Sequence, residues 1–472
     1  MNRRIFLFSA ASAVLATRGL AAEPATVTFL LPTAAGVPMA QDFIGLSYET
    51  GQLYNGSFFA PANRALVEAF CGISTEGVLR MGGHLSNITD WEGVGRDQPK
   101  QKDGIRHGIE DYWEWPLVDP SVQKNKRGII TRQTLKNLRG FLEATNWRLI
   151  YGLNFASGSA ARAADEAAAV AEIVGPRLMA FVIGNEVDGF SEDPVFRPAT
   201  YGPAAFMDEY EVWVKAIRAR VPKAQFAGPD TEANVEKWVL PFAKRTKGDL
   251  LLLTSHYYGM GPASDPAMTA ERLLRKETPE LDHQIELVNQ ARALGGGVAY
   301  RMDEGNSCFG GGRKGVSDAY ASALWAAEYL LRAAVAGFAG VNLHGGGQGV
   351  YTPIESSETA PAQPRPVYYG MLLARQFAGG TVVRCPLDTT ANLTAYLGKK
   401  KDRLQLGFIN KGAEPVRVAL PAPFNLGKLE RSNLTGPALD ATTGVQFAVA
   451  QQTDRTNFIE IPGYSGAVVQ PL

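Results

Sequence analysis

Hydrophobic and polar positions follow two alternating patterns along most of the chain. From residue 43 onward, short apolar runs are followed by longer stretches whose apolar positions recur with helical spacing. The apolar runs of strand length lie at residues 43–49, 77–83, 148–154, 179–186, 225–231, 251–258, 297–307 and 339–345. The helical patterns between them include residues 63–70, 131–145, 160–174, 204–221 and 317–336. Strands that alternate with helices in this way predict a parallel sheet of the α/β class.

Eight strand–helix units are also the number that closes a (β/α)8 TIM barrel. An open doubly wound sheet is the alternative, but eight units fill a barrel with none left over. After about residue 380 the pattern changes to short alternating segments such as TVVRCPL and RLQLGFIN, which are typical of an antiparallel β-sandwich. We therefore predict a catalytic barrel over residues 43–379 and a C-terminal β-sandwich over 380–472. Residues 23–42 are expected to supply an N-terminal strand that joins the β-sandwich.

The first 22 residues have the pattern of a twin-arginine signal peptide. Arg3 and Arg4 precede an apolar stretch over residues 6–16, and residues 20–22 offer a small-residue cleavage site. An ordinary helix or a membrane anchor is the alternative, although the apolar stretch is shorter than the roughly 20 residues that span a bilayer. We expect a periplasmic or secreted protein with no stable membrane association.

The charge balance narrows the classes of partner. The 472 residues include 47 Lys and Arg and 47 Asp and Glu, and this neutral total argues against a nucleic-acid or membrane-surface binder. Small molecules and polysaccharides remain as partners. The three cysteines form no CxxC pair, and the five histidines have no HxxxH or HExxH spacing, so we expect no metal and no other cofactor. Nothing in the pattern indicates the oligomeric state.

Two glutamates stand at the predicted carboxyl ends of barrel strands. Glu186 follows Asn185 in FVIGNEVD at the end of the fourth strand, and Glu304 lies in YRMDEGNS at the end of the seventh. These strand ends face each other across the mouth of a barrel. Retaining glycoside hydrolysis needs two carboxyl groups about 5–5.5 Å apart, one to protonate the leaving oxygen and one to attack the anomeric carbon. We predict this chemistry for the two glutamates; two solvated loop carboxylates are the alternative.

A long loop over about residues 92–130 is predicted after the second strand. It contains Tyr112, Trp113 and Trp115, and Trp91 comes just before it. Such loops are usually lids or binding walls, so the aromatic side chains could face a sugar ring. Packing of the loop against the barrel is an equal alternative.

Several sequence strings carry a family resemblance. They are GLSYE (45–49), GVLRMGGHLSN (77–87), IGNEVD (183–188), HYY (256–258), DEGNSCFGGG (303–312) and HGGGQGVYTPI (344–354). The Asn-Glu pair with a later strand-end glutamate resembles clan A of the retaining glycoside hydrolases. Within this clan the strings resemble the heparanase-related glycoside hydrolase family 79, above all its bacterial β-glucuronidases, over nearly the whole mature chain. The resemblance implies exo-acting β-glucuronidase activity by double displacement through a glycosyl-enzyme intermediate.

The resemblance also implies the roles of single residues. Glu186 would be the acid/base, Glu304 the nucleophile, and Asn185 the donor to the sugar 2-hydroxyl. Arg80, at the end of the second strand, matches a position that orients the nucleophile, and a cation there keeps a nearby carboxylate ionised. A structural ion pair is the alternative for Arg80.

Three further residues match positions near the sugar or the nucleophile. Tyr258 or Tyr257 on the sixth strand would orient the nucleophile, with core packing as the alternative. Glu49, at the end of the first strand, would bind sugar hydroxyls or cap a neighbouring helix.

The uronate preference depends on the last group of matching positions. In the resembling enzymes a tyrosine and backbone amides of the strand-8 loop hold the C6 carboxylate, and Gly349 and Tyr351 match them. A second tyrosine is replaced here by Phe309, which has no hydroxyl; losing a donor to a buried carboxylate costs about 1.5–3 kcal/mol. Arg313 or Lys314 could compensate, although solvated side chains are the alternative. An acidic and a neutral sugar both stay open.

Other functions use the same residues. A clan A hydrolase acting on a β-glucoside, a β-xyloside or an arabinofuranoside would need the same glutamates, and the choice between endo and exo action also stays open. A non-catalytic secreted carbohydrate-binding protein is the other class, but it would not need this set of polar groups. Residues 310–315 match GxGxxG, yet they follow the seventh strand and a loop already begun after Glu304, so we predict a mobile active-site loop instead of a dinucleotide site.

Overall fold

The computed structural model describes residues 26–93, 128–192, 196–232, 234–346, 349–356 and 361–472. The predicted signal peptide (1–22) and the loop aromatics Tyr112, Trp113 and Trp115 lie outside the described residues. None of the helices in the described ranges combines the length and the apolar character that a membrane crossing requires.

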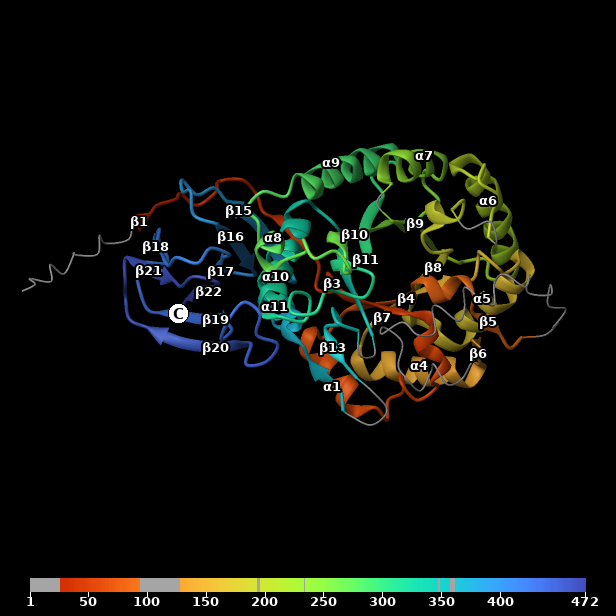
Figure 1. The fold of residues 1–472 in the computed structure, drawn as a ribbon, viewed down its shortest axis with the longest axis horizontal. Helices are drawn as coiled ribbons and strands as arrows, with labels where there is room; N and C mark the ends of the chain where they lie inside the picture. The colour runs from red at the N-terminus through yellow and green to blue at the C-terminus, as the bar shows by residue number, and fades with distance from the viewer. Residues whose placement is uncertain (1–25, 94–127, 193–195, 233, 347–348, 357–360) are drawn as a thin grey trace, which may run out of the picture.

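Eight parallel strands close into a barrel, and the sequence prediction of a TIM barrel is confirmed (Figure 1). The strands follow chain order around the barrel, and the last strand pairs with the first. They are β3 (Ile44–Glu49), β4 (Val78–Gly82), β7 (Arg148–Leu153), β8 (Leu178–Ile183), β9 (Phe226–Thr231), β10 (Leu252–Pro262), β11 (Ala299–Phe309) and β12 (Gly340–Gly345).

Helices lie outside the strands and on the connections between them (Figure 1). The α-helices are α1 (Arg64–Ile73), α4 (Arg132–Thr145), α5 (Ala160–Val174), α6 (Pro203–Arg220), α7 (Leu240–Arg245), α8 (Ala270–Leu273), α9 (Pro279–Leu294), α10 (Tyr320–Val335) and α11 (Pro366–Arg375). Short helical turns are η1 (Thr50–Tyr54), η2 (His84–Asn87), η3 (Gly175–Arg177), η4 (Val187–Gly189) and η5 (Val235–Val239). Two small strand pairs, β5 (Asp90–Trp91) with β6 (Ile129–Ile130) and β13 (Ile354–Glu355) with β14 (Gln363–Pro364), complete the barrel side.

Helix α4 illustrates how local sequence sets these elements. The Thr131 side chain caps its first turn by accepting a hydrogen bond from the Thr134 amide at 3.1 Å. The helix ends at Asn146, which adopts the left-handed conformation (φ 59°) that asparagine tolerates at a helix C-terminus. Its apolar face is buried through Leu135, Leu138, Phe141 and Leu142. Such helix faces cover the outside of the barrel and hold the strand ends in register.

The C-terminal part of the chain forms an antiparallel β domain beside the barrel, as the sequence predicts (Figure 1). Its larger sheet has the order β2-β15-β16-β17-β22-β19-β20, and its smaller sheet has the order β1-β18-β21. The two sheets share one apolar cluster, which includes Val27, Phe408, Val418, Ile461 and Val469. The strands are β1 (Thr26–Val27), β2 (Val37–Met39), β15 (Gly380–Cys385), β16 (Leu393–Lys400), β17 (Arg403–Asn410), β18 (Val416–Ala419), β19 (Leu429–Thr435), β20 (Gln446–Thr453), β21 (Phe458–Ile461) and β22 (Ser465–Pro471).

Polar contacts tie the β domain to the barrel helix α10. The Tyr320 hydroxyl donates to the carbonyl oxygen of Leu434 at 3.0 Å and lies 2.7 Å from that of Tyr464. Lys411 forms an ion pair with Glu328, and both side chains are buried. These contacts join α10 to three segments of the β domain that are far from it in the sequence, and they fix the β domain against the barrel.

Candidate active site

Charged side chains gather at the carboxyl ends of the barrel strands, around a cavity of about 420 Å³. The titratable residues that the barrel strands and the turns after them supply to this cavity include Glu49, His84, Glu186, Glu232, His256, Tyr258, Glu304 and His344. In a TIM barrel this face carries the active site. The cavity is therefore the candidate active site.

Glu304, on β11, is held by two partners at its two carboxylate oxygens. The Tyr258 hydroxyl donates to Oε1 at 2.8 Å, and the Arg80 guanidinium forms an ion pair with Oε2. Burial by itself raises the pKa of Glu304, but the charges of His344, His256 and Arg80 outweigh it and leave the pKa below its usual value. Glu304 is therefore ionised near neutral pH, as a nucleophile must be.

Arg80, on β4, binds several of the buried polar side chains of the site. Its side chain is 1% exposed, and its Nη2 donates to Asp230 Oδ2 and Asn185 Oδ1 at 2.6 Å each. Its Nη1 also donates to Ser47 Oγ at 3.1 Å. Because Arg80 takes the oxygen of the Asn185 amide, the Nδ2 donor is left over; this buried nitrogen has no hydrogen-bond partner among the described residues. A bound sugar hydroxyl could accept from it.

Asp230 and Asp303 form a carboxyl pair below Glu304. Burial and the neighbouring Asp230 raise the pKa of Asp303 well above its usual range, so Asp303 carries a proton. Burial opposes ionisation of Asp230 as well, but Arg80 and His256 lower the pKa of Asp230 far enough to keep it charged. Arg80 thus faces two carboxylates, Asp230 and Glu304, instead of three.

Glu186 follows β8 in a strained backbone conformation. Its φ of 50° and ψ of 48° are left-handed, which costs a non-glycine residue roughly 1–2 kcal/mol. Gly184 just before it has φ 89°, and the Glu186 amide donates to the Asp230 carbonyl oxygen at 2.7 Å. This turn places the Glu186 side chain over the barrel mouth instead of along the strand.

Two histidines hold the Glu186 carboxylate from opposite oxygens. His256 Nδ1 lies 2.9 Å from Oε1, and His84 Nε2 lies 2.8 Å from Oε2. Burial raises the pKa of Glu186, but the charge of His84 and the hydrogen bond of His256 lower it well below its usual value. The pKa of His84 is in turn raised to about 9, because the Glu186 charge outweighs the effect of burial. With these partners Glu186 is a carboxylate, and the protons lie on the two histidines.

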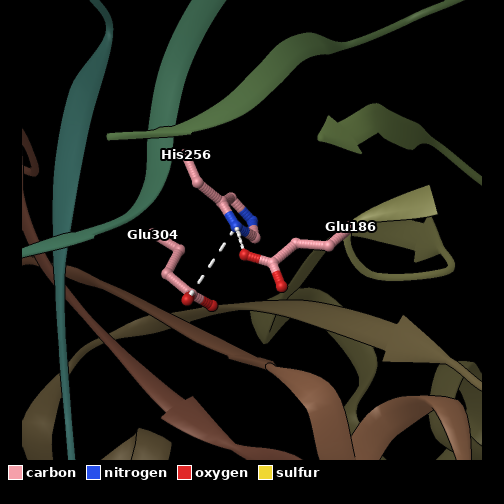
Figure 2. Close-up of side chains that lie close together, drawn as sticks. All are labelled: Glu186, His256 and Glu304. Atoms are coloured by element: carbon pink, nitrogen blue, oxygen red, sulfur yellow. Dashed lines mark hydrogen bonds and ion pairs between the residues drawn. The ribbon is translucent and has the colours of Figure 1, made fainter. Parts of the chain in front are cut away.

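Glu186 and Glu304 approach each other closely beside His256 (Figure 2). One carboxylate oxygen of each glutamate and a His256 nitrogen all lie within 4.8 Å of one another. This spacing would also admit a metal ion, but the Arg80 guanidinium in contact with Glu304 puts a positive charge beside that position. The same spacing suits two carboxyl groups that act on opposite sides of one glycosidic bond.

The structure distinguishes between the two adjacent tyrosines of β10. Tyr258 reaches Glu304, whereas the Tyr257 ring stacks on Tyr329 with centroids 5.4 Å apart. Side chains alternate between the two faces of a strand, so the two tyrosines point to different faces of β10, and Tyr258 is the one that meets Glu304. Tyr257 borders another part of the cavity, where its ring packs on Tyr329.

The structure places Glu49 at the turn η2 and at the cavity wall, so both roles that the sequence left open stay possible. Its Oε2 accepts the Leu85 amide at 2.9 Å and so holds the turn η2, while its Oε1 lies 3.5 Å from His344 Nε2. Glu49 also lines the cavity, where it can meet a sugar hydroxyl.

The three residues expected near a C6 carboxylate lie at different places relative to the cavity. The Tyr351 ring lines the cavity, with its hydroxyl 3.5 Å from that of Tyr258. Phe309 lies at the rim and is 45% exposed. The Gly349 amide donates to the Gly346 carbonyl oxygen at 3.1 Å, so this donor is already used.

The segment after Glu304 corrects one expectation. It is not a loop already begun, because β11 continues to Phe309 and pairs with β10 as far as Pro262. The turn starts only at Gly310, and residues 310–312 all have positive φ (74°, 88° and 90°). Of the two cations considered there, Arg313 donates to the Ala263 carbonyl oxygen at 3.0 Å.

Five residues of the cluster were not assigned from the sequence: His84, His256, His344, Asp230 and Asp303. Three of them stood inside quoted strings, in GGHLSN, HYY and HGGG, and Asp303 stood beside Glu304 in DEGNS. Their common signal is a titratable residue at or just after the carboxyl end of a barrel strand. Applied to every strand, that rule would have found them.

Comparisons with known proteins add relatives and fold neighbours. No protein-family model matches the chain. A β-glucuronidase from Aspergillus niger is 26% identical over 253 residues, which cover 48% of this chain and 46% of that protein. A β-glucuronidase from Neurospora crassa is 26% identical over 263 residues, which cover 47% of this chain and 46% of that protein. The chain spans about half the length of the curated relatives it matches.

Solved structures are similar over nearly the whole chain. A 4-O-α-L-rhamnosyl-β-D-glucuronidase from Fusarium oxysporum gives a TM-score of 0.70 at 16% identity and covers 94% of this chain and 100% of its own. A family 51 α-L-arabinofuranosidase from Bifidobacterium longum gives 0.68 at 14% identity, with 94% and 98% covered. At these identities the likeness shows the fold, a barrel with an attached β domain.

Proposed function

We propose that the chain is a retaining exo-acting glycoside hydrolase of the clan A type, similar to family 79, that removes β-glucuronosyl residues. The observation that carries the proposal is that one carboxylate oxygen of Glu186 lies within 4.8 Å of one of Glu304, with Glu304 bound to Arg80 and Tyr258. An inverting enzyme would need its carboxyl groups roughly 6.5–9.5 Å apart to admit a water.

In the first step Glu304 attacks the anomeric carbon. The bond between that carbon and the glycosidic oxygen breaks, and the oxygen takes a proton from Glu186 as the aglycone leaves. The Asn185 amide nitrogen, which lacks a partner in the described site, donates to the 2-hydroxyl. Such contacts strengthen as positive charge develops on the sugar ring.

In the second step water releases the sugar. Glu186, now a carboxylate, takes a proton from the water while the water oxygen attacks the anomeric carbon. The bond to Glu304 breaks, and Arg80 and Tyr258 stabilise the departing carboxylate. The sugar leaves with the configuration it had in the substrate.

The choice of sugar is supported by the two relatives named β-glucuronidase and by Tyr351, which lines the cavity. A neutral sugar is the second candidate, because Phe309 carries no hydroxyl at the rim. Export through the twin-arginine signal remains part of the proposal, since an exported enzyme would meet its glycoside substrates outside the cytoplasm.

The test is a panel of aryl β-glycosides with the purified protein. We expect the β-glucuronide to react faster than the β-glucoside, β-xyloside and arabinofuranoside, and NMR of the first-formed anomer to report retention. Glu304→Ala should abolish hydrolysis, whereas Glu186→Ala should mainly slow substrates with poor leaving groups. Near wild-type rates in Glu304→Ala would disprove the mechanism, and a faster β-glucoside would disprove the choice of sugar.

A further inference from the structure

His84 differs from the other histidines at the barrel mouth in its access to water. Its side chain is 31% exposed, whereas His256 and His344 are each 1% exposed. It sits in the turn η2 directly after β4 and borders the cavity. Its Nε2 nevertheless reaches Glu186 Oε2 at 2.8 Å. Among the described histidines, His84 thus combines partial exposure with direct contact to the predicted acid.

We propose that His84 is a positioning residue that stores the proton of Glu186 and exchanges it with solvent, an inference that rests on the proposed function. One proton is shared along the hydrogen bond between His84 Nε2 and Glu186 Oε2. With the proton on His84 the pair is an imidazolium and a carboxylate; with the proton on Glu186 both groups are neutral. The two forms contain the same atoms and the same total charge.

Substrate binding supplies the reason for the proton to move. A sugar in the cavity displaces water from the charged pair, and loss of water penalises two separate charges more than two neutral groups. The neutral pair, in which Glu186 is the acid, is therefore favoured when substrate is bound. After the aglycone has taken this proton, the attacking water returns one to Glu186, and no proton is consumed over the cycle.

The groups around His84 set the direction of this equilibrium. Burial opposes a proton on His84, whereas the carboxylates of Glu186, Glu49, Glu304 and Glu232 favour one. His256 is the other histidine bound to Glu186. Since the pKa of His84 is about 9, the pair keeps its shared proton up to that pH. Activity requires this proton, so the alkaline limb of kcat/KM is expected near pH 9. Without His84, Glu186 keeps only its bond to His256, whose ring is shared with Asp230 and Glu304, and the limb falls to lower pH.

The kinetic test compares His84→Gln with the wild type over the pH range. We expect the alkaline limb to move down by about 2 pH units, since a carboxyl group that has lost this imidazole partner releases its proton well below pH 9. At pH 8 a substrate with a poor leaving group should lose about 100-fold in kcat/KM, the usual contribution of general acid catalysis, and one with a good leaving group far less. His283→Gln is the matched control, because His283 is an exposed histidine on α9. An unmoved limb in His84→Gln overturns the proposal.

A second measurement needs no activity and keeps His84 in place. NMR titration of the histidine rings, assigned by the signal that His84→Gln removes, should give a pKa near 9 in the wild type. It should fall by more than one pH unit in Glu186→Gln. An ordinary imidazole pKa in the wild type, or no fall in Glu186→Gln, also overturns the proposal. If no glycoside is hydrolysed at any pH, the proposed function fails while this titration still decides whether the pair shares a proton.

Discussion

Arg80 is the residue on which the charges of the site depend. Its positive charge compensates the negative charges of Asp230 and Glu304, and all three side chains are almost fully buried. Replacing Arg80 would leave both carboxylates without their cation, and breaking a buried ion pair in this way costs about 3–5 kcal/mol. The same loss would raise the pKa of Glu304, since a nearby positive charge now lowers it.

We therefore expect Arg80→Met to lower both stability and activity. Thermal and urea unfolding should report a loss of about 3–5 kcal/mol. Glu304 must be ionised to react, so activity exists above its pKa; a higher pKa moves the acid limb of kcat/KM to higher pH. Arg139→Met is the control, because Arg139 forms an exposed pair with Glu143 on α4, and such pairs contribute about 0.3–0.5 kcal/mol. An acid limb that stays in place would contradict the role of Arg80.

Phe309 offers a test of sugar preference at the same scale. Its ring lies edge-on to Tyr258, with centroids 6.3 Å apart, at the cavity rim. Phe309→Tyr would add a donor beside a C6 carboxylate, and we expect the ratio of kcat/KM for β-glucuronide over β-glucoside to rise about 10-fold or more. Phe309→Leu changes the wall without adding a hydroxyl and should not raise the ratio. Equal ratios in all three proteins would place the C6 group elsewhere.

At the scale of elements, the turn after β11 positions the wall of the cavity. Gly312 has φ 90°, and a Cβ there would lie 2.7 Å from the Tyr351 amide nitrogen and 2.8 Å from its Cβ. Gly315 has a similar φ of 77°, but a Cβ there would meet no atom within 4 Å. A substitution at either glycine strains the backbone, but only one at Gly312 also collides with Tyr351. Comparing the two therefore distinguishes the two effects.

Gly312→Ala is expected to displace Tyr351 and raise KM. Gly315→Ala carries the same kind of backbone strain, roughly 1 kcal/mol, and should change stability with little effect on KM. Steady-state kinetics and thermal unfolding of the two variants make the comparison. If both variants change KM alike, the contact with Tyr351 is not what matters.

The elements were predictable from the sequence to a greater extent than the contacts of the site. Apolar runs and helical spacing identify the strands because burial in a barrel demands them, and they place Glu186 just after β8 and Glu304 on β11. The end of β11 did not follow from its run, because the strand continues to Phe309. The bond of Arg80 to Asp230 joins residues 150 positions apart, and only the closed barrel determines it. The choice between Tyr257 and Tyr258 likewise depends on which side chains of β10 point toward Glu304. Two adjacent aromatic residues in a sequence do not show this.

At the scale of the whole molecule, barrel and β domain are joined by a buried charge. Lys411 pairs with Glu328 of α10 and also donates to the Arg275 carbonyl oxygen at 2.9 Å. Each partner alone would be an uncompensated buried charge. We expect Lys411→Met to cost about 3–5 kcal/mol, measured by urea unfolding.

The double variant Lys411→Met with Glu328→Leu completes this test. Removing both charges together should recover most of the loss, because apolar groups of similar size often replace a buried pair without cost. A double variant as unstable as Lys411→Met alone would show that the pair is not the source of the effect. Far-UV circular dichroism checks that each variant retains its fold.

The strand pairing of the first described residues also governs the order in which the molecule can fold. Strand β1 precedes the barrel, yet Thr26 and Val27 pair with Arg417 and Val418, and β2 pairs with β15. A ribosome therefore releases the first strands long before their partners exist. The barrel can assemble during synthesis, but both sheets of the β domain must wait for the last part of the chain. Completion of the fold is thus a late event in synthesis, and a chain stopped before β15 would expose unpaired strands at its start.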